Sequence, residues 1–390
     1  MNKSGLNNLF FFLSLTSSFF FASCGSENSE FDSDGKKIVY IGHAGPLTGP
    51  IAHLGKDNEN GVKLAIQEAN DKNISLNGET INFKIVSVDD EGKESKTTLV
   101  AQKLVDSEVS GVIGHLNSGT TIPASKIYHD EGIPQISPSA TNVNYTNQGF
   151  PGAFRVMAND KQQGSALASF AINDINAVKI AVIDDRTAYG KGLADIFEDT
   201  AESLGGIIST REFTDVTKSD FTAILTKIKG LNVDLIFYAG MDVQGGPMLK
   251  QLENLALKVN FLTGDGCQTL QFIELAGRSS QGVYASSPGV PLDRMPGGST
   301  FNLMYEQTFN QPIQIYGPYA YDAANTLIDA MVKADSSLPE NYLPFLKNIQ
   351  FKGVTGDISF DAKGDIKRGS ISMYQVKNSN WEFLKTLGDN

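Results

Sequence analysis

The chain has 390 residues, a formal net charge of −12 and hydrophobic side chains at 41% of its positions. The excess of acidic residues argues against binding to nucleic acid and against a polybasic membrane-binding surface. The length exceeds what one hydrophobic core usually organises, so two lobes are predicted. Because the only cysteines are Cys24 and Cys267, no disulfide framework is expected and the fold must rely on a large core.

The start of the chain is predicted to be a targeting segment. An apolar run from Leu9 to Ala22 follows the single charge of Lys3 and is too short to span a bilayer, which is typical of a signal peptide over residues 1–23. The sequence around Cys24 looks like a lipobox with this cysteine as the acylated residue; an ordinary signal peptide with an incidental cysteine is the alternative. Residues 24–36 are polar and are expected to form a disordered tether. We therefore expect an exported lipoprotein, periplasmic or at the cell surface, anchored to the membrane.

From residue 37 onward, predicted strands and helices alternate. Apolar runs predict strands, and apolar residues at helical spacing predict amphipathic helices. Such alternation implies an α/β fold with parallel sheets and helices on both faces. Strands are predicted at 38–41, 83–88, 111–114, 133–136, 179–183, 234–238 and 260–262, and helices at 58–70, 99–104, 155–175 and 189–204. Further helices and a strand pair near 354–360 are expected to complete both lobes.

Two turns at predicted strand ends favour a binding site for a small, amino-acid-like ligand. Both are rich in small hydroxylated residues, including Ser118 and Thr141, and both precede stretches where helix N–H groups are exposed. Hydroxyl groups and the backbone N–H groups at Thr120 and nearby suit a carboxylate. A cation on the ligand needs a carboxylate partner, for which Asp265 in the second series of strands is the candidate. The alternative is that Ser118 and Thr141 are simply helix caps.

Motifs for catalysis are absent from the sequence. It has no Walker loop, no nucleophile elbow and no dinucleotide fingerprint, and its four histidines show no metal-ligand spacing. The acidic run Asp89-Asp90-Glu91 is a candidate for acid–base chemistry, although such a run more often caps a helix. Cys267 has no identifiable base beside it. We expect no cofactor, no metal and no enzymatic activity.

Several motifs occur along the chain in order. They are Gly45-Pro46-Leu47-Thr48-Gly49, the stretch VIGHLNSGTTIPASKIYHDEG over 112–132, residues 138–141, Tyr189-Gly190-Lys191-Gly192-Leu193, Tyr321-Asp322-Ala323 and Gly356-Asp357-Ile358-Ser359-Phe360-Asp361. In these motifs the chain resembles the branched-chain amino acid binding proteins of ABC transporters, of the leucine/isoleucine/valine-binding type. The resemblance covers residues 37–383.

This resemblance implies a type I periplasmic binding protein with the Venus-flytrap fold. Two Rossmann-like lobes would be joined by a three-crossover hinge and would close on one ligand. The expected boundaries are 37–156 with 287–365 for the N-terminal lobe, and 157–286 with 366–390 for the C-terminal lobe. The protein would act as a monomer and deliver its ligand to an ABC transporter permease.

The resemblance also implies a set of ligand-binding residues. Ser118 and Thr141 would hold the ligand carboxylate and ammonium, Asp265 would face the ammonium, Tyr189 would close over the ligand, and Tyr316 would be a pocket aromatic. The other residues expected in the site are Leu54, Leu116, Asn117, Ser139, Ala140 and Met241.

Several of these residues depart from the family pattern. Leu54 and Met241 stand where leucine-type receptors carry tyrosines, Asn117 where some carry a disulfide-bonded cysteine, and Ser139 where a small apolar residue is usual. Asp265 is one methylene shorter than the usual glutamate. The pocket wall is therefore altered, with room for a larger or a polar side chain.

The sequence thus predicts a lipid-anchored receptor that supplies a neutral amino acid, branched-chain or other, to an ABC importer. The main alternative is a sensor of the same fold that responds to an amide or small molecule and signals instead of transporting. The second is an enzyme acting in the cleft, with Asp89 to Glu91 as its residues.

Overall fold

The computed structural model describes residues 30–388. The predicted signal peptide, Cys24 and part of the predicted tether lie outside the described residues. Within residues 30–388, no helix has the length and apolar character needed to cross a membrane. Just before the first strand, the Asp32 carboxylate accepts hydrogen bonds from the Lys36 N–H at 2.9 Å and from the Asn82 side chain at 2.7 Å. These bonds attach the described end of the tether to the first lobe.

The first lobe is built on a six-stranded sheet in the order β2-β3-β1-β4-β5-β6. β2 and β3 form an antiparallel pair, and all other neighbouring strands run parallel. Parallel neighbours need a crossover connection, which the intervening helices supply. The strands are β1 (Lys37–Gly45), β2 (Ser75–Leu76), β3 (Glu79–Asp89), β4 (Val112–Gly114), β5 (Gln135–Ser137) and β6 (Ala153–Arg155).

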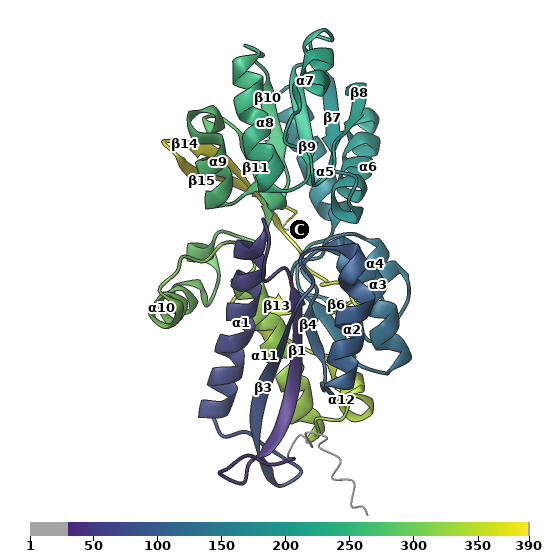
Figure 1. Cartoon of the computed structure of the whole chain (residues 1–390), viewed down its shortest axis with the longest axis vertical. Coiled ribbons are helices and arrows are strands. Elements are labelled where there is room, and N and C mark those ends of the chain that lie inside the picture. Colours follow the sequence, from purple (N-terminus) through teal and green to yellow (C-terminus); the bar gives the residue numbers. More distant parts are fainter. Residues whose placement is uncertain (1–29, 389–390) are drawn as a thin grey trace, which may run out of the picture.

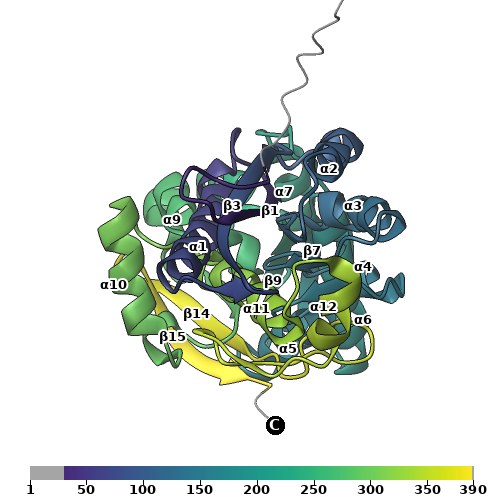
Figure 2. The same cartoon turned by 90° about the horizontal axis from the view of Figure 1, so that it is seen from below.

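The second lobe has a seven-stranded sheet in the order β15-β14-β11-β10-β9-β7-β8. Its strands are β7 (Lys179–Asp184), β8 (Ile207–Phe213), β9 (Leu235–Ala239), β10 (Asn260–Thr263), β11 (Tyr284–Pro288), β14 (Ile371–Lys377) and β15 (Asn380–Leu387). β14 and β15 are antiparallel and lie at one edge of the sheet (Figure 2). The predicted parallel arrangement holds for most of this sheet, and the hairpin departs from it because its strands are joined by a short turn that needs no crossover helix.

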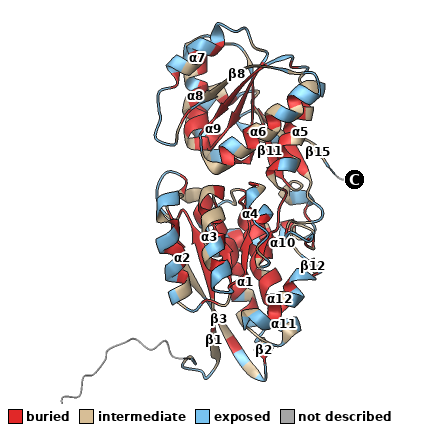
Figure 3. Ribbon diagram, turned by 90° about the vertical axis from the view of Figure 1, so that its right-hand side faces the viewer, coloured by how far each residue is buried: buried red, intermediate tan, exposed pale blue. Residues whose placement is uncertain are grey.

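Helices cover both sheets and bury central strands such as β4, β5 and β9, whereas the edge strands β8 and β15 are only partly buried (Figure 3). The first lobe carries α1 (Ala52–Asp71), α2 (Thr97–Asp106), α3 (Ser118–Asp130), α4 (Asn144–Asn147), α10 (Gly298–Phe309), α11 (Gly317–Ala334) and α12 (Pro339–Lys347), and a small hairpin of β12 (Phe351–Lys352) and β13 (Asp357–Ile358). The second carries α5 (Asp160–Asn173), α6 (Ala188–Ser203), α7 (Thr222–Lys229), α8 (Asp242–Asn254) and α9 (Leu270–Ala276). Short 3₁₀ helices are η1 (Glu94–Lys96), η2 (Asp265–Cys267), η3 (Gly277–Ser280) and η4 (Leu292–Arg294).

The chain passes between the lobes three times (Figure 1). It leaves the first lobe after β6, returns after β11, and crosses again between β13 and β14. The parallel strands of both sheets direct their carboxyl ends toward the space between the lobes, where doubly wound sheets bind ligands.

The first crossover also decides where α5 begins. A helix was predicted over 155–175, but Arg155 ends β6 and the helix starts at Asp160. Asn159 forms a capping box: its side chain accepts from the N–H groups of Lys161 and Gln162, and the Gln162 side chain accepts from the Asn159 N–H. This cap sets the start of α5 at Asp160, whereas the apolar spacing alone predicted an earlier start.

Arg155 gives a first testable prediction, because its guanidinium is fully buried and pairs with Asp365 of the third crossover at 2.6 Å. Asp365→Ala leaves that charge uncompensated, so we expect the free energy of unfolding to fall by about 3–5 kcal/mol. Denaturant titration measures it. Asp130→Ala, which breaks the exposed pair with Lys126, is the control and should cost at most about 1 kcal/mol. Equal effects of the two variants would contradict a special role for the buried pair.

Candidate functional site between the two lobes

A small cavity lies where the two lobes meet. Its volume is about 20 Å³ and both lobes line it. The first lobe contributes Leu116, Asn117, Ser118, Ser139 and Tyr316, and the second contributes Tyr189, Met241 and Asp265. All of these residues were predicted for the site from the sequence. The cavity has room for about one water molecule, so an amino acid enters only if side chains or lobes move apart.

The turn after β4 places Asn117 and Ser118 at the start of α3. Asn117 is the N-cap residue, and its carbonyl accepts from the N–H of Thr120 at 3.1 Å. The expectation that the Thr120 N–H faces a ligand was therefore wrong. The N–H groups of Ser118 and Gly119 come first in the helix and have no helical partner, which makes this helix end suited to an anion.

The turn after β5 packs directly against the first turn. The Ser118 hydroxyl accepts from the Asn142 N–H at 3.2 Å, and the Ser139 hydroxyl donates to the Leu116 carbonyl at 3.3 Å. Since the N-cap positions of α3 and α4 are Asn117 and Val143, the interpretation of Ser118 and Thr141 as helix caps was wrong.

Three predicted site residues are buried but do not line the cavity. Leu54 lies inside α1, and Ala140 is held by Arg155, whose guanidinium donates to its carbonyl at 2.7 Å. Thr141 is 1% exposed, and its carbonyl accepts from the Asp160 N–H at 2.8 Å.

Asp265 is the polar centre of the cavity. One carboxylate oxygen accepts from Gln163 at 2.9 Å and Tyr189 at 2.8 Å, and the other accepts from Tyr316 at 2.7 Å. Burial, and next the nearby charge of Asp265, raises the pKa of both tyrosines, so their hydroxyls stay protonated and donate. All three partners are neutral, and among residues 30–388 no lysine, arginine or histidine forms an ion pair with this carboxylate.

Tyr316 is held in place by a buried carboxylate on α1. Asp57 accepts from the N–H groups of Ile315, Tyr316 and Gly317 at 3.1, 2.8 and 2.7 Å. Burial raises the pKa of Asp57, while these backbone donors act in the opposite direction. The Asp57 carboxylate thus lies at the N-terminus of α11, where the helix dipole favours a negative charge.

Direct contacts between the lobes surround the cavity. His53 Nε2 lies 2.8 Å from Asp242 Oδ2, and the Asn142 side chain donates to the Ala188 carbonyl at 2.6 Å. Sequence reasoning missed these four residues, and Gln163 with them. These contacts join segments that are far apart in the chain, so no local sequence pattern marks them.

The residues considered for catalysis have structural roles. Asp89 accepts from the Leu47 N–H and the Thr48 hydroxyl, and buried Asp90 contacts His115 at 2.7 Å. Burial raises the pKa of the Cys267 thiol well above its usual value, which disfavours a nucleophilic thiolate. No cluster of metal-binding side chains occurs within residues 30–388.

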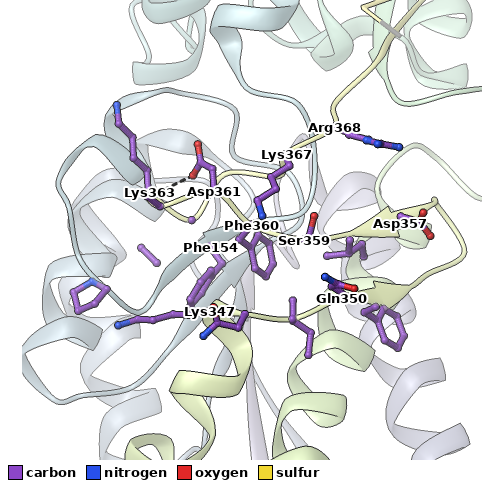
Figure 4. Close-up of a pocket in the computed structure, with 18 of the residues that line it drawn as sticks. Phe154, Lys347, Gln350, Asp357, Ser359, Phe360, Asp361, Lys363, Lys367 and Arg368 are labelled. Carbon is purple, nitrogen blue, oxygen red and sulfur yellow. Dashed lines mark hydrogen bonds between the residues drawn. The ribbon is translucent and has the colours of Figure 1, made fainter. Parts of the chain in front are cut away.

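A larger hollow of about 990 Å³ lies on the first lobe, away from the cleft (Figure 4). Phe154 and Phe360 lie in its floor with ring centroids 4.8 Å apart, and exposed side chains such as Lys367 and Arg368 surround it. None of the predicted site residues lines it. The polar side chains that line it are on the surface, whereas the small cavity holds a buried carboxylate contacted by both lobes, so the small cavity is the candidate site.

A model of the periplasmic binding protein family matches residues 38–380. The chain belongs to this family. It is 35% identical over 338 residues to the Leu/Ile/Val-binding protein homolog 1 of Brucella abortus (strain 2308), covering 86% of this chain and 90% of that protein. It is 30% identical over 337 residues to the leucine-, isoleucine-, valine-, threonine-, and alanine-binding protein of Pseudomonas aeruginosa. That match covers 86% of this chain and 89% of the relative.

The fold agrees with this family. The structure of the branched-chain amino acid transporter substrate binding protein LivJ from Streptococcus pneumoniae, in complex with isoleucine, matches with a TM-score of 0.82 and 27% identity, over 90% of this chain and 99% of that one. As a member of this family, the protein is an extracytoplasmic solute-binding protein and not an enzyme. The predicted type I fold is confirmed.

Closure of the lobes gives a second prediction, at Gly192 on α6. A Cβ there would lie 2.3 Å from Asn142 Nδ2, whose position is fixed by its bond to Ala188, and 3.3 Å from Asp160 Oδ2. Gly192→Ala should therefore hold the lobes apart and increase the radius of gyration measured by small-angle X-ray scattering. If the clash raises the free energy of the closed form by about 1.4 kcal/mol relative to the open form, the ratio of closed to open molecules falls tenfold.

The control is Gly230→Ala, where a Cβ would meet only an ordinary contact at 3.4 Å. An unchanged radius of gyration in Gly192→Ala would contradict this account of closure.

Proposed function

We propose that this protein captures a neutral amino acid between its two lobes and delivers it, as a membrane-anchored lipoprotein, to an ABC importer. The observation that carries the proposal is the buried carboxylate of Asp265, which accepts hydrogen bonds from both lobes and faces no protein cation. A ligand ammonium would supply the missing positive charge. Relatives named for leucine, isoleucine, valine, threonine and alanine support an amino acid as the ligand.

Recognition would use opposite ends of the same cavity. The ligand carboxylate would meet the first N–H groups of α3 and the Ser118 hydroxyl, where the helix dipole favours an anion. The ammonium would meet Asp265 and Thr141, with Tyr189 closing from the second lobe. The side chain would then lie toward Leu116 and Met241.

The mechanism would be closure about the three crossovers. A ligand stabilises the closed form only as far as it contacts that form better than the open one. Since Asp265 and Tyr189 belong to the second lobe and Ser118 to the first, an amino acid held by all three would favour closure. The closed form would be the one that a permease recognises.

The anchor would leave the cleft accessible. Lys37 begins β1 at the end of the first lobe remote from the cleft, because the carboxyl end of that strand faces the second lobe (Figure 1). A lipid on Cys24, thirteen positions earlier in the sequence, would therefore attach on the side away from the ligand.

A thermal-shift screen of the full chain against the twenty common amino acids tests the proposal. An amino acid that binds the native state at about one hundred times its Kd adds about 2.7 kcal/mol of stability and raises the Tm. Simple amides and organic acids form the comparison set. A response to these compounds alone, with none from any amino acid, would overturn the proposal.

Asp265→Asn and Thr141→Ala should each weaken binding of the responding amino acid. Removing one partner of a buried charge pair costs about 2–5 kcal/mol, so Asp265→Asn should lower the affinity by roughly 30-fold or more in isothermal titration calorimetry. Asp130→Asn, on the surface of α3, is the matched control and should bind as the wild type does. Unchanged affinity in both site variants would remove the proposed site.

The lipid anchor is tested separately. Cys24→Ala removes the only thiol of the predicted lipobox, so the variant should lose incorporation of labelled fatty acid and leave the membrane pellet for the soluble fraction. Cys267→Ala, at the other cysteine, should keep both properties. Membrane association and labelling that survive in Cys24→Ala would disprove acylation at this residue.

A further inference from the structure

A histidine and an aspartate join the two lobes directly. His53, on α1 of the first lobe, places its Nε2 2.8 Å from Oδ2 of Asp242, on α8 of the second lobe. Asp242 is fully buried, and the side chain of His53 is 20% exposed. Met241, which lines the small cavity, directly precedes Asp242 in the chain. The pair therefore lies next to the cavity wall, although neither of its members lines the cavity.

The Asp242 carboxylate has few other partners. Its Oδ2 also accepts from the Thr269 hydroxyl at 2.7 Å, whereas its Oδ1 has no hydrogen-bond partner among residues 30–388. Asp242 is the first residue of α8, where the helix dipole favours a negative charge, yet within the described residues its carboxylate accepts from no N–H group of that helix. Since the Thr269 hydroxyl is neutral, the imidazole of the opposite lobe is the group that can meet the charge on Asp242.

The contact depends on closure, because α1 and α8 belong to different lobes and separate when the lobes move apart about the crossovers. A protonated imidazole makes a charge-assisted hydrogen bond to a carboxylate, which is stronger than the bond made by a neutral one. Burial of Asp242 also protects the pair from screening by salt. Protonation of His53 should therefore favour the closed form over the open form.

The groups around the pair leave His53 as its titrating member. On α1, exposed Lys56 and buried Asp57 follow His53 within about one turn. Burial, followed by the charge of nearby carboxylates that include Asp242, raises the pKa of three groups: Tyr238 on β9, Cys267 on η2 and Tyr316 before α11. These three groups stay protonated near neutral pH. Histidine is the side chain whose charge ordinarily changes between pH 5 and 8.

We propose that His53 and Asp242 form a pH-sensitive latch between the lobes. Protonation of His53 holds the second lobe against the first and slows the release of a bound ligand. Both residues are positioning residues, since they act on the ligand only by holding the two halves of the cavity wall together. The latch goes beyond the proposed function, because it acts on any compound that the closed cleft holds.

The experiment is isothermal titration calorimetry at pH 6 and pH 8, with the compound that gives the largest Tm increase in the thermal-shift screen as titrant. His53→Gln keeps a neutral donor and loses the charge. A hydrogen bond to a charged group contributes about twice as much as a neutral one, so the variant should bind about tenfold more weakly than wild type at pH 6 and less than about threefold more weakly at pH 8. His129→Gln is the matched control and should bind as the wild type does, because exposed His129 stacks on Phe150 of its own lobe.

The readout is the ratio of the wild-type affinity to the variant affinity at each pH. Burial raises the pKa of Asp160 to about 7 and that of Asp185 to about 6, so these carboxyls also titrate in this range. They do so in wild type and in His53→Gln alike, and the ratio removes their shared contribution. An equal ratio at pH 6 and pH 8, or an unchanged affinity of His53→Gln at pH 6, would overturn the latch.

Two further measurements separate a latch from a merely structural role. In stopped-flow experiments at pH 6, His53→Gln should release the titrant faster with an unchanged association rate constant, because the latch forms only after the ligand has entered. Adding Asp242→Asn to His53→Gln should weaken binding no further, since the pair is already broken. Slower association in place of faster release, or losses that add, would contradict the proposal.

Small-angle X-ray scattering tests the latch without a ligand. The radius of gyration of the wild type should be smaller at pH 6 than at pH 8, and that of His53→Gln should be the same at both; equal radii in the wild type would contradict the latch. Failure of the proposed function is distinguishable from this result. If the titrant is an amide or an organic acid, the proposed function fails and the latch is still tested. If an amino acid binds with an affinity ratio that does not change with pH, only the latch is overturned.

Discussion

The buried guanidinium of Arg155 is the interaction on which the site and the hinge both depend. It pairs with Asp365 from the third crossover and donates to the carbonyls of Ala140 and Asn142, on either side of Thr141. An arginine suits this position because its planar fork offers several donors in fixed directions. The same side chain therefore ties together two of the three interlobe segments and shapes the turn that carries Thr141. Removing its carboxylate partner should disturb stability and site geometry together, since one buried charge supports both.

Two buried carboxylates near the cleft, Asp57 and Asp265, differ in the groups that surround them. Asp57 is surrounded by backbone N–H groups and fixes the start of α11. Asp265 is contacted by two tyrosine hydroxyls and an amide, which hold it in place without cancelling its charge. The first carboxylate is thus satisfied by the fold, whereas the second is held by neutral groups alone, and the proposed binding of a ligand ammonium rests on this difference.

Sequence periodicity predicted the architecture because local chemistry specifies it. Alternating apolar runs and amphipathic spacing predicted parallel βα units, and the strand ends predicted where Ser118 and Asp265 would be. The predictions were wrong where other interactions decide. Capped by Asn159, α5 begins at Asp160, five residues later than the apolar pattern indicated, and the β14–β15 hairpin runs antiparallel because a short turn joins its strands. The Thr120 N–H is used inside α3, which the composition of the turn does not show.

By itself, the sequence determined the fold class, the two-lobed organisation and most residues that line the cavity, since these follow from periodicity and from turns at strand ends. Only the tertiary structure decided which groups share the cavity. Gln163 and Tyr316 are 153 positions apart in the chain and donate to the same carboxylate, and His53 contacts Asp242 of the opposite lobe.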